Sequence, residues 1–229
     1  ATLLVEESYS PTDLEPKNVK EERLGVEIQK GIDETSRNLD MSIVHLENAL
    51  KKYEFSSEGT INALIRIKEQ AAYIKDHFDE MLQKLEQEQV TFSDTVEVDE
   101  DSLDRMYKAA KALYDENLYK EATLVFNLLV LLEPDQPVFW IGLGHSAFIS
   151  DNNEDALQAF KVASSIEPEN PVYELMIAKC HEQLQEYNLA IDVLDQIINK
   201  LGKDPEFDSI KEQVREIREE ISFKSQNHA

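Results

Sequence analysis

Two segments of this chain repeat each other at an interval of 34 residues, and this interval restricts the fold more than any other feature of the sequence. Leu113, Ala122, Phe126 and Pro134 are followed 34 residues later by Ala147, Ala156, Phe160 and Pro168. A weaker third copy supplies His181, Ala190 and Leu194, with Gly202 at the place of the proline. A fixed interval of this length indicates one supersecondary unit that is repeated and stacked along the chain.

Alanine, a large apolar residue and proline at these offsets are typical of the tetratricopeptide repeat (TPR), a pair of packed helices A and B. We expect three such pairs over residues 102–202. Pro137 and Pro171 suit the first turn of the second and third A helices, because a missing N–H costs nothing there. Gly144 is expected where paired helices approach too closely for a side chain.

A different pattern precedes the repeats. Apolar residues at spacings of three and four predict two helices separated by a break over 54–60, with Thr60 as the N-cap of the second. The two apolar stripes are Ile28, Ile32, Thr35, Leu39, Ile43, Leu46, Leu50 and Tyr53, and then Ile67, Ala71, Ile74, Phe78, Met81 and Leu85. We expect a coiled-coil-like antiparallel hairpin over 21–90, between a disordered segment 1–20 and an acidic linker 91–101. Each stripe needs a partner, and the sequence leaves open whether this is the other helix or a second subunit.

A final amphipathic helix is predicted after the repeats. Gly202 can end the last B helix, and Asp204 and Pro205 can start the next one. Its apolar positions are Phe207, Ile210, Val214, Ile217 and Ile221. We expect a C-terminal capping helix and tail over 203–229, frayed from Lys224, that covers the last repeat. The predicted fold class is therefore all-α: an N-terminal helical hairpin, a three-repeat TPR solenoid and a capping helix.

The charge of the chain limits its partners. With 47 acidic and 23 basic side chains the net charge is −24, which repels nucleic-acid phosphates and anionic lipid. We therefore expect no nucleic-acid partner and no membrane partner, and no apolar run has the length of a membrane helix. A secretory signal is not evident, and a single cysteine suits a reducing compartment, so a cytoplasmic location is expected. The acidity serves solubility, or it attracts basic partners.

No pattern of residues indicates catalysis. The five histidines are scattered and form no metal-ligand motif with Cys180, and no phosphate-binding or nucleophile motif occurs. Cys180 lies near core positions of the third A helix, which favours a buried, inert thiol. We expect no enzyme activity, no metal and no cofactor.

The concave face of such a solenoid is the predicted binding site. In a TPR, positions 2, 5, 9, 12 and 13 of helix A point into this face, and in the second repeat they are distinctly apolar. Such a face predicts capture of an extended peptide, unless the hairpin or the capping helix covers it. The predicted groove residues are Tyr107, Lys111, Tyr114, Val138, Ile141, His145, Phe148, Ile149, Leu175 and Lys179. TPR co-chaperones that bind acidic C-terminal peptides carry polar or basic residues where this chain has Tyr107 and Gly142, so that mode of binding is not expected.

Residues 102–200 resemble the class II chaperones of bacterial type III secretion, of the SycD/LcrH kind. The most specific stretch is FWIGLG over 139–144, and the run YKEA over 119–122 and Phe126 also fit. The resemblance implies a bacterial cytoplasmic chaperone that keeps a hydrophobic translocator protein soluble and unassembled before secretion. It implies that an extended client segment contacts Tyr107, Tyr114, Ile141, His145, Phe148 and Leu175.

The N-terminal hairpin exceeds what this family usually carries, and it keeps a second hypothesis open. In that alternative the protein is a non-enzymatic TPR scaffold or assembly factor, whose heptad helices bind another subunit or form a homodimer. The hairpin could also cover the groove or hold a different protein partner.

Overall fold

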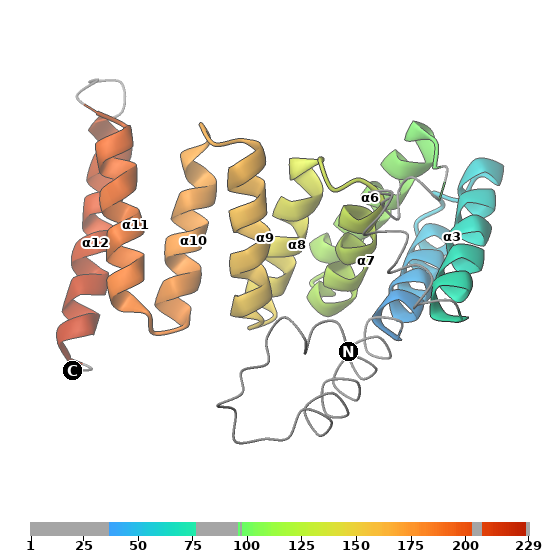
Figure 1. Cartoon of the computed structure of the whole chain (residues 1–229), viewed down its shortest axis with the longest axis horizontal. Helices are drawn as coiled ribbons and strands as arrows, with labels where there is room; N and C mark the ends of the chain where they lie inside the picture. The colour runs from blue at the N-terminus through green and yellow to red at the C-terminus, as the bar shows by residue number, and fades with distance from the viewer. Residues whose placement is uncertain (1–36, 77–95, 97, 203–207, 228–229) are drawn as a thin grey trace, which may run out of the picture.

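The computed structural model describes residues 37–76, 96, 98–202 and 208–227, and their regular secondary structure is entirely helical (Figure 1). This confirms the predicted all-α class. None of the described helices has the length and apolar character needed to cross a membrane. The helices are an unlabelled one over 37–52, α3 (Glu58–Asp76), α6 (Glu100–Asp115), α7 (Tyr119–Leu132), α8 (Pro137–Ile149), α9 (Asn153–Ile166), α10 (Pro171–Gln183), α11 (Tyr187–Lys200) and α12 (Asp208–Asn227).

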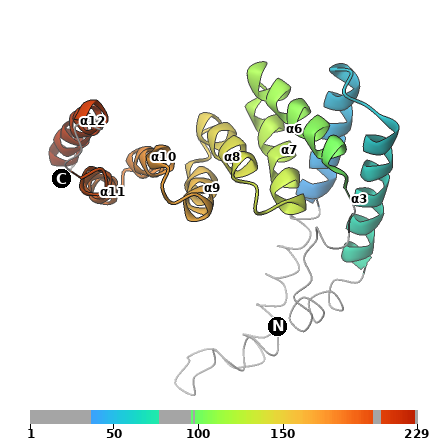
Figure 2. The same ribbon diagram turned by 90° about the horizontal axis from the view of Figure 1, so that it is seen from above.

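The helices from α6 to α12 form a solenoid in which each helix packs against the next one in the chain (Figure 1). Three A–B pairs make up the repeats: α6 with α7, α8 with α9, and α10 with α11. Seen from above, α8 and α10 lie along one side of the array and α9 and α11 along the other (Figure 2). The A helices therefore present one face together, as the 34-residue interval requires.

Turn residues repeat at the same interval as the core. Pro137 and Pro171 occupy the first turn of α8 and α10, as predicted. Between the A and B helices of each pair, one residue has a left-handed backbone: Asn117 (φ 63°), Asp151 (φ 62°) and Gln185 (φ 62°). Asparagine and aspartate tolerate this conformation well, whereas glutamine at the third turn is less suited to it. The three turns thus reverse the chain in the same way.

Two glycines of α8 allow its close packing between two B helices. A β-carbon at Gly142 would lie 2.2 Å from the ring of Phe126 on α7, and one at Gly144 would lie 2.7 Å from the ring of Phe160 on α9. Such separations are impossible for a real β-carbon, so glycine is required unless the rings move. The prediction for Gly144 is confirmed, and Gly142 has the same role toward the preceding repeat.

The N-terminal helix pair packs against the first repeat. Leu46, Leu50 and Ile67 are fully buried in one core cluster with Met106 and with other residues of α6 and α7. The described part of the predicted stripe therefore finds its partner within the chain. Other parts of these predictions lie outside the described residues. They are the disordered segment 1–20, the stripe positions Ile28, Ile32, Thr35 and Phe78 to Leu85, and most of the linker 91–101.

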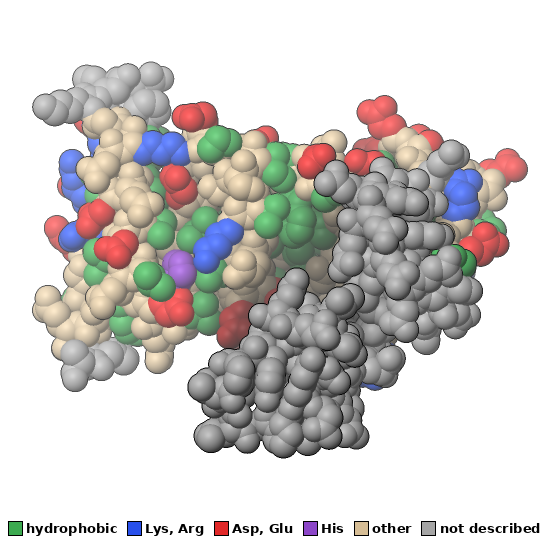
Figure 3. Space-filling model, in the orientation of Figure 1, with side chains coloured by type: hydrophobic (Ala, Val, Ile, Leu, Met, Phe, Trp, Pro, Cys, Tyr) green, Lys and Arg blue, Asp and Glu red, His purple; other side chains and the backbone are tan. Residues whose placement is uncertain are grey.

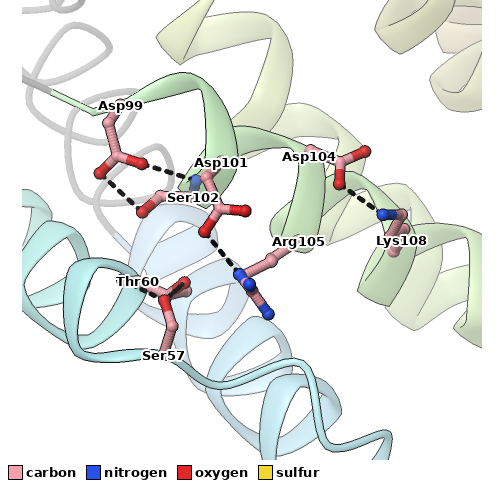
Figure 4. Close-up of polar contacts among 8 residues, drawn as sticks. All are labelled: Ser57, Thr60, Asp99, Asp101, Ser102, Asp104, Arg105 and Lys108. Carbon is pink, nitrogen blue, oxygen red and sulfur yellow. Dashed lines mark hydrogen bonds and ion pairs between the residues drawn. The ribbon is translucent and has the colours of Figure 1, made fainter.

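The N-cap predicted for the second helix of this pair is wrong. The Ser57 Oγ accepts a hydrogen bond from the Thr60 N–H at 3.1 Å, so Ser57 is the capping residue, and Thr60 lies in the first turn of α3. Both residues are near the start of α6 (Figure 4). There, Asp99 caps α6 through the Ser102 N–H (2.9 Å) and the Ser102 hydroxyl (2.8 Å), so α6 begins two residues before the predicted start of the repeats.

The C-terminal helix α12 covers the last repeat, as expected for a cap. Val214 and Ile221 are buried in a cluster with Leu194 and other residues of α10 and α11. The Arg218 guanidinium donates two hydrogen bonds to the Asp195 carboxylate on α11, at 2.6 and 3.0 Å. The expected fraying from Lys224 is wrong, because α12 continues to Asn227. Asp204 and Pro205 lie outside the described residues.

Candidate peptide-binding face

The A helices bring the predicted groove residues onto one face of the solenoid, which we call the A-helix face. Each residue keeps its repeat position from one helix to the next, so equivalent side chains form rows across the three helices. The face comprises Tyr107, Lys111 and Tyr114 on α6, Val138, Ile141, His145, Phe148 and Ile149 on α8, and Val172, Leu175 and Lys179 on α10.

The α8 part of this face is apolar and accessible. Val138 and Ile149 are 37% and 43% exposed, and Val172 on the next A helix is 53% exposed. Ile141 and Phe148 are half-buried, and Phe148 packs against the core cluster of the second and third repeats. Apolar side chains that stay in water at adjacent helices form a surface that an apolar partner would dehydrate favourably.

The two tyrosines of α6 belong partly to the core. The Tyr107 ring centroid lies 6.3 Å from that of Phe126 and 5.8 Å from that of Phe139. The Tyr114 ring packs edge-on against Tyr119 at 5.2 Å, and burial raises the pKa of the Tyr114 hydroxyl. This end of the face is therefore lined by two half-buried aromatic rings that pack against neighbouring rings.

His145 stands at the middle of the face in a neutral form. Its ring packs edge-on against Phe160, with centroids 5.2 Å apart. Burial, and secondarily the charge of Lys179, lower the pKa of the His145 imidazole. At neutral pH this side chain offers one N–H donor and one acceptor to a ligand, without a charge.

The far end of the face is bounded by the capping helix. Leu175 is half-buried and packs against the cluster formed with α11 and α12. Glu182, two turns further along α10, accepts a hydrogen bond from Lys224 of α12 at 2.6 Å. The capping helix thus partly covers Leu175, while Ile149 remains exposed. The described N-terminal helices reach α6, and they bury the end of the solenoid.

Cys180 faces away from this surface. It is fully buried, and burial raises the pKa of the thiol to about 12. A thiol at that pKa is almost entirely protonated at neutral pH and is a poor nucleophile. The predicted burial of Cys180 is confirmed, and its lack of reactivity stays a prediction. Among the described residues, no cluster of three or more His, Cys, Asp or Glu side chains could hold a metal ion.

A second set of exposed apolar side chains, on the N-terminal helix pair, was not predicted from the sequence. On the N-terminal helix pair, Met41 and Val44 of the first helix and Ile61 and Ile65 of α3 are between 42% and 52% exposed. We call these four residues the outer face. Met41 and Val44 are three residues apart, and Ile61 and Ile65 are four apart, which are helical spacings that could have predicted an apolar surface. The longer core stripe on the same helices makes this short pattern difficult to recognise.

The rest of the surface is dominated by acidic groups. In the view of Figure 3, hydrophobic side chains gather around the middle of the array, where α8 and its neighbours lie, and most acidic side chains visible there lie outside that cluster. With a net charge of −24, the surface is strongly polar around a limited apolar region.

Comparisons with known proteins agree with this architecture. The tetratricopeptide repeat family model matches residues 147–214. The type III secretion chaperone SycD of Yersinia enterocolitica, in complex with a peptide of the translocator YopD, is 24% identical with a TM-score of 0.50, over 56% of this chain and 98% of that chain. A T3SS complex from Aeromonas hydrophila is 19% identical with a TM-score of 0.54, over 64% of this chain and 98% of that chain. No curated protein matches the sequence.

At these identities the structural likenesses establish the fold, and the family match establishes the repeat. The matches extend over nearly the whole length of both solved chains, whereas they leave more than a third of this chain unmatched. Residues 147–214 therefore match the tetratricopeptide repeat, and the chain shares its fold with solved proteins that include a type III secretion chaperone.

Proposed function

We propose that this protein is a bacterial cytoplasmic chaperone for type III secretion. It binds an extended apolar segment of a translocator-type protein on the A-helix face and keeps that client soluble and unassembled before secretion. The protein itself catalyses no reaction in this proposal. It acts by covering apolar client surface that would otherwise aggregate.

The observation that carries the proposal is the exposed apolar centre of the A-helix face. Val138, Ile149 and Val172 remain in contact with water on adjacent A helices, although the core beneath them is closely packed. Ile141 and Phe148 lie between Val138 and Ile149 along α8, and as half-buried side chains they add apolar area to the same surface. Val138 and Val172 occupy equivalent positions at the starts of α8 and α10, and Ile149 lies at the other end of α8, so an extended chain that crosses the face can contact all three.

The surrounding charge fits a chaperone that holds an aggregation-prone client. A net charge of −24 keeps chaperone–client complexes apart by mutual repulsion. The structural likeness to SycD, whose solved complex contains a translocator peptide, supports the proposal that the A-helix face binds a client peptide.

Co-expression with candidate translocators, followed by affinity capture of the full chain, tests the proposal. We expect Ile149→Glu and Val172→Glu to lose the client, because each places a charge on the apolar contact surface. Both residues are already exposed, so the substitutions leave the core intact. Leu189→Glu is the matched control, since Leu189 is 48% exposed on the B helix α11. Capture of the client by both A-helix-face variants at the level of the unchanged protein would overturn the proposal.

The outer face supports a second function, that of a scaffold whose N-terminal helices bind another subunit or a second copy of the chain. Ile67, in the described part of the predicted heptad stripe, is buried in the cluster with α6, so a partner would contact exposed side chains such as Val44 and Ile65 instead. Sedimentation equilibrium tests the homodimer. We expect Val44→Asp combined with Ile65→Asp to reduce self-association, whereas Phe223→Asp on α12, 69% exposed, leaves it unchanged. A monomeric parent protein would exclude the homodimer.

A further inference from the structure

Basic or titratable side chains recur at one repeat position of the A-helix face. Lys111 on α6, His145 on α8 and Lys179 on α10 are separated by 34 residues each, so they form one row across the solenoid. Apolar side chains lie on both sides of this row in the middle repeat. In a chain with 47 acidic side chains, nitrogen donors along the centre of an apolar face are unexpected.

The two lysines of the row differ in their partners. Lys111 donates to the carboxylate of Asp115, four residues later on the same helix, at 2.6 Å. Gln183 stands four residues after Lys179 and cannot neutralise it. The nearest acid along α10 is Glu182, and Lys224 of α12 binds that carboxylate at 2.6 Å. Within the described residues, Lys179 forms no ion pair.

Lys179 is also partly removed from water. Its side chain is half-buried one turn after Leu175, and it lies close enough to His145 to disfavour protonation of that imidazole. A half-buried cation without a counter-charge loses part of its hydration and gains no compensating attraction. A ligand that brings a carboxylate to this point would supply that attraction in surroundings of reduced polarity.

We propose that Lys179 sets the client specificity of the A-helix face by binding one acidic side chain within an otherwise apolar client segment. This inference rests on the function proposed above and names the chemistry of the segment. The charge of the whole chain limits the segment to few acids, because every further carboxylate meets repulsion from the acidic surface. Lys179 then acts as the single attractive position, and it fixes the register of the bound segment.

Amidated, acetylated 12-residue peptides of leucine, valine and proline provide the probe, with one glutamate moved along the peptide and a matched glutamine set. Fluorescence anisotropy with the full chain measures their affinities at low and high salt. At one glutamate position we expect binding about tenfold tighter than the glutamine peptide, and a loss of this preference at high salt. Blocked peptide ends remove the terminal carboxylate as a source of the effect.

Two variants assign the preference to Lys179. Lys179→Gln should abolish the preference for glutamate, so that the two peptides of each glutamate–glutamine pair bind this variant with equal affinity. Gln183→Asp should also abolish it, since it supplies Lys179 with the internal partner that Asp115 gives Lys111. Lys111→Gln is the matched control and should retain the preference.

The outcomes separate the two proposals. If no apolar peptide binds, the function proposed for the A-helix face fails, and this inference fails with it. If both peptide sets bind but glutamate gives no advantage at any position, the role of Lys179 is overturned and the proposed function stands. A preference that survives in both Lys179→Gln and Gln183→Asp would also overturn the role of Lys179.

Discussion

Gly144 on α8 faces the ring of Phe160 on α9 so closely that a β-carbon at residue 144 would come within 2.7 Å of two ring atoms. Gly142 meets Phe126 on α7 in the same way. The two rings occupy equivalent positions in successive repeats, and α8 is packed between them. This packing sets the position of α8, and with it the apolar centre of the A-helix face.

Replacement of Gly142 by alanine tests this packing. We expect Gly142→Ala to lower the free energy of unfolding by about 1–3 kcal/mol, because overpacking outweighs the higher helix propensity of alanine, which is about 1 kcal/mol. Urea denaturation followed by circular dichroism measures the change. Gly59→Ala is the control: its added methyl would lie 3.3 Å from the nearest heavy atom, so a smaller loss is expected. A Gly142→Ala protein as stable as its parent would contradict the packing role.

The N-terminal helix pair should contribute directly to the stability of the repeats. Leu46 is fully buried in the cluster that contains Met106, so Leu46→Ala leaves a cavity between the pair and α6. We expect a loss of about 2–5 kcal/mol in the free energy of unfolding, measured by urea denaturation. Val44→Ala on the same helix, where the side chain is 52% exposed, should change stability little. Equal effects of the two substitutions would show that the pair does not pack on the repeats.

The stability of the protein should fall at mildly acidic pH through His145. Burial and Lys179 lower the pKa of this imidazole in the folded state, so the unfolded state binds the proton more readily. The stabilisation is complete above the unfolded pKa of about 6.5 and is lost as the pH falls toward the lower folded value. Unfolding midpoints measured from pH 7.5 to 5 should decrease less steeply for His145→Gln. Parallel pH profiles would contradict this assignment.

Cys180 should react only when the structure opens. Its thiol is buried, and its pKa is raised to about 12, so both access and ionisation are suppressed. We expect a thiol-specific disulfide reagent at pH 8 to modify the native chain at least about 100-fold more slowly than the chain in urea. Addition of a peptide that binds the A-helix face should not accelerate the reaction. Equal rates for the native and unfolded chains would show that the thiol is accessible.

Much of the repeat region could be predicted from local chemistry. The B helices begin at Tyr119, Asn153 and Tyr187, which occupy the same repeat position, and the prolines of α8 and α10 lie where their geometry suits a first turn. These features depend on residues close together in the chain, so their spacing is sufficient to predict them. The cap of α3 shows the limit, because serine and threonine are both suited to an N-cap and only the position of the backbone shows that Ser57 has this role.

The sequence by itself determined the class of fold and the number of repeats, because the 34-residue interval and helical periodicity are properties of the chain alone. The face on which it places a ligand site stays a prediction. Only the tertiary structure decided what covers each face. It buried the described part of the hairpin stripe against α6 and left Met41 and Val44 exposed. It packed half-buried Tyr107 against core rings, and it gave Lys111 an acidic partner that Lys179 lacks among the described residues. The physical reason is that periodicity places an apolar stripe on one side of a helix, whereas the partner of that stripe depends on contacts between residues far apart in the chain.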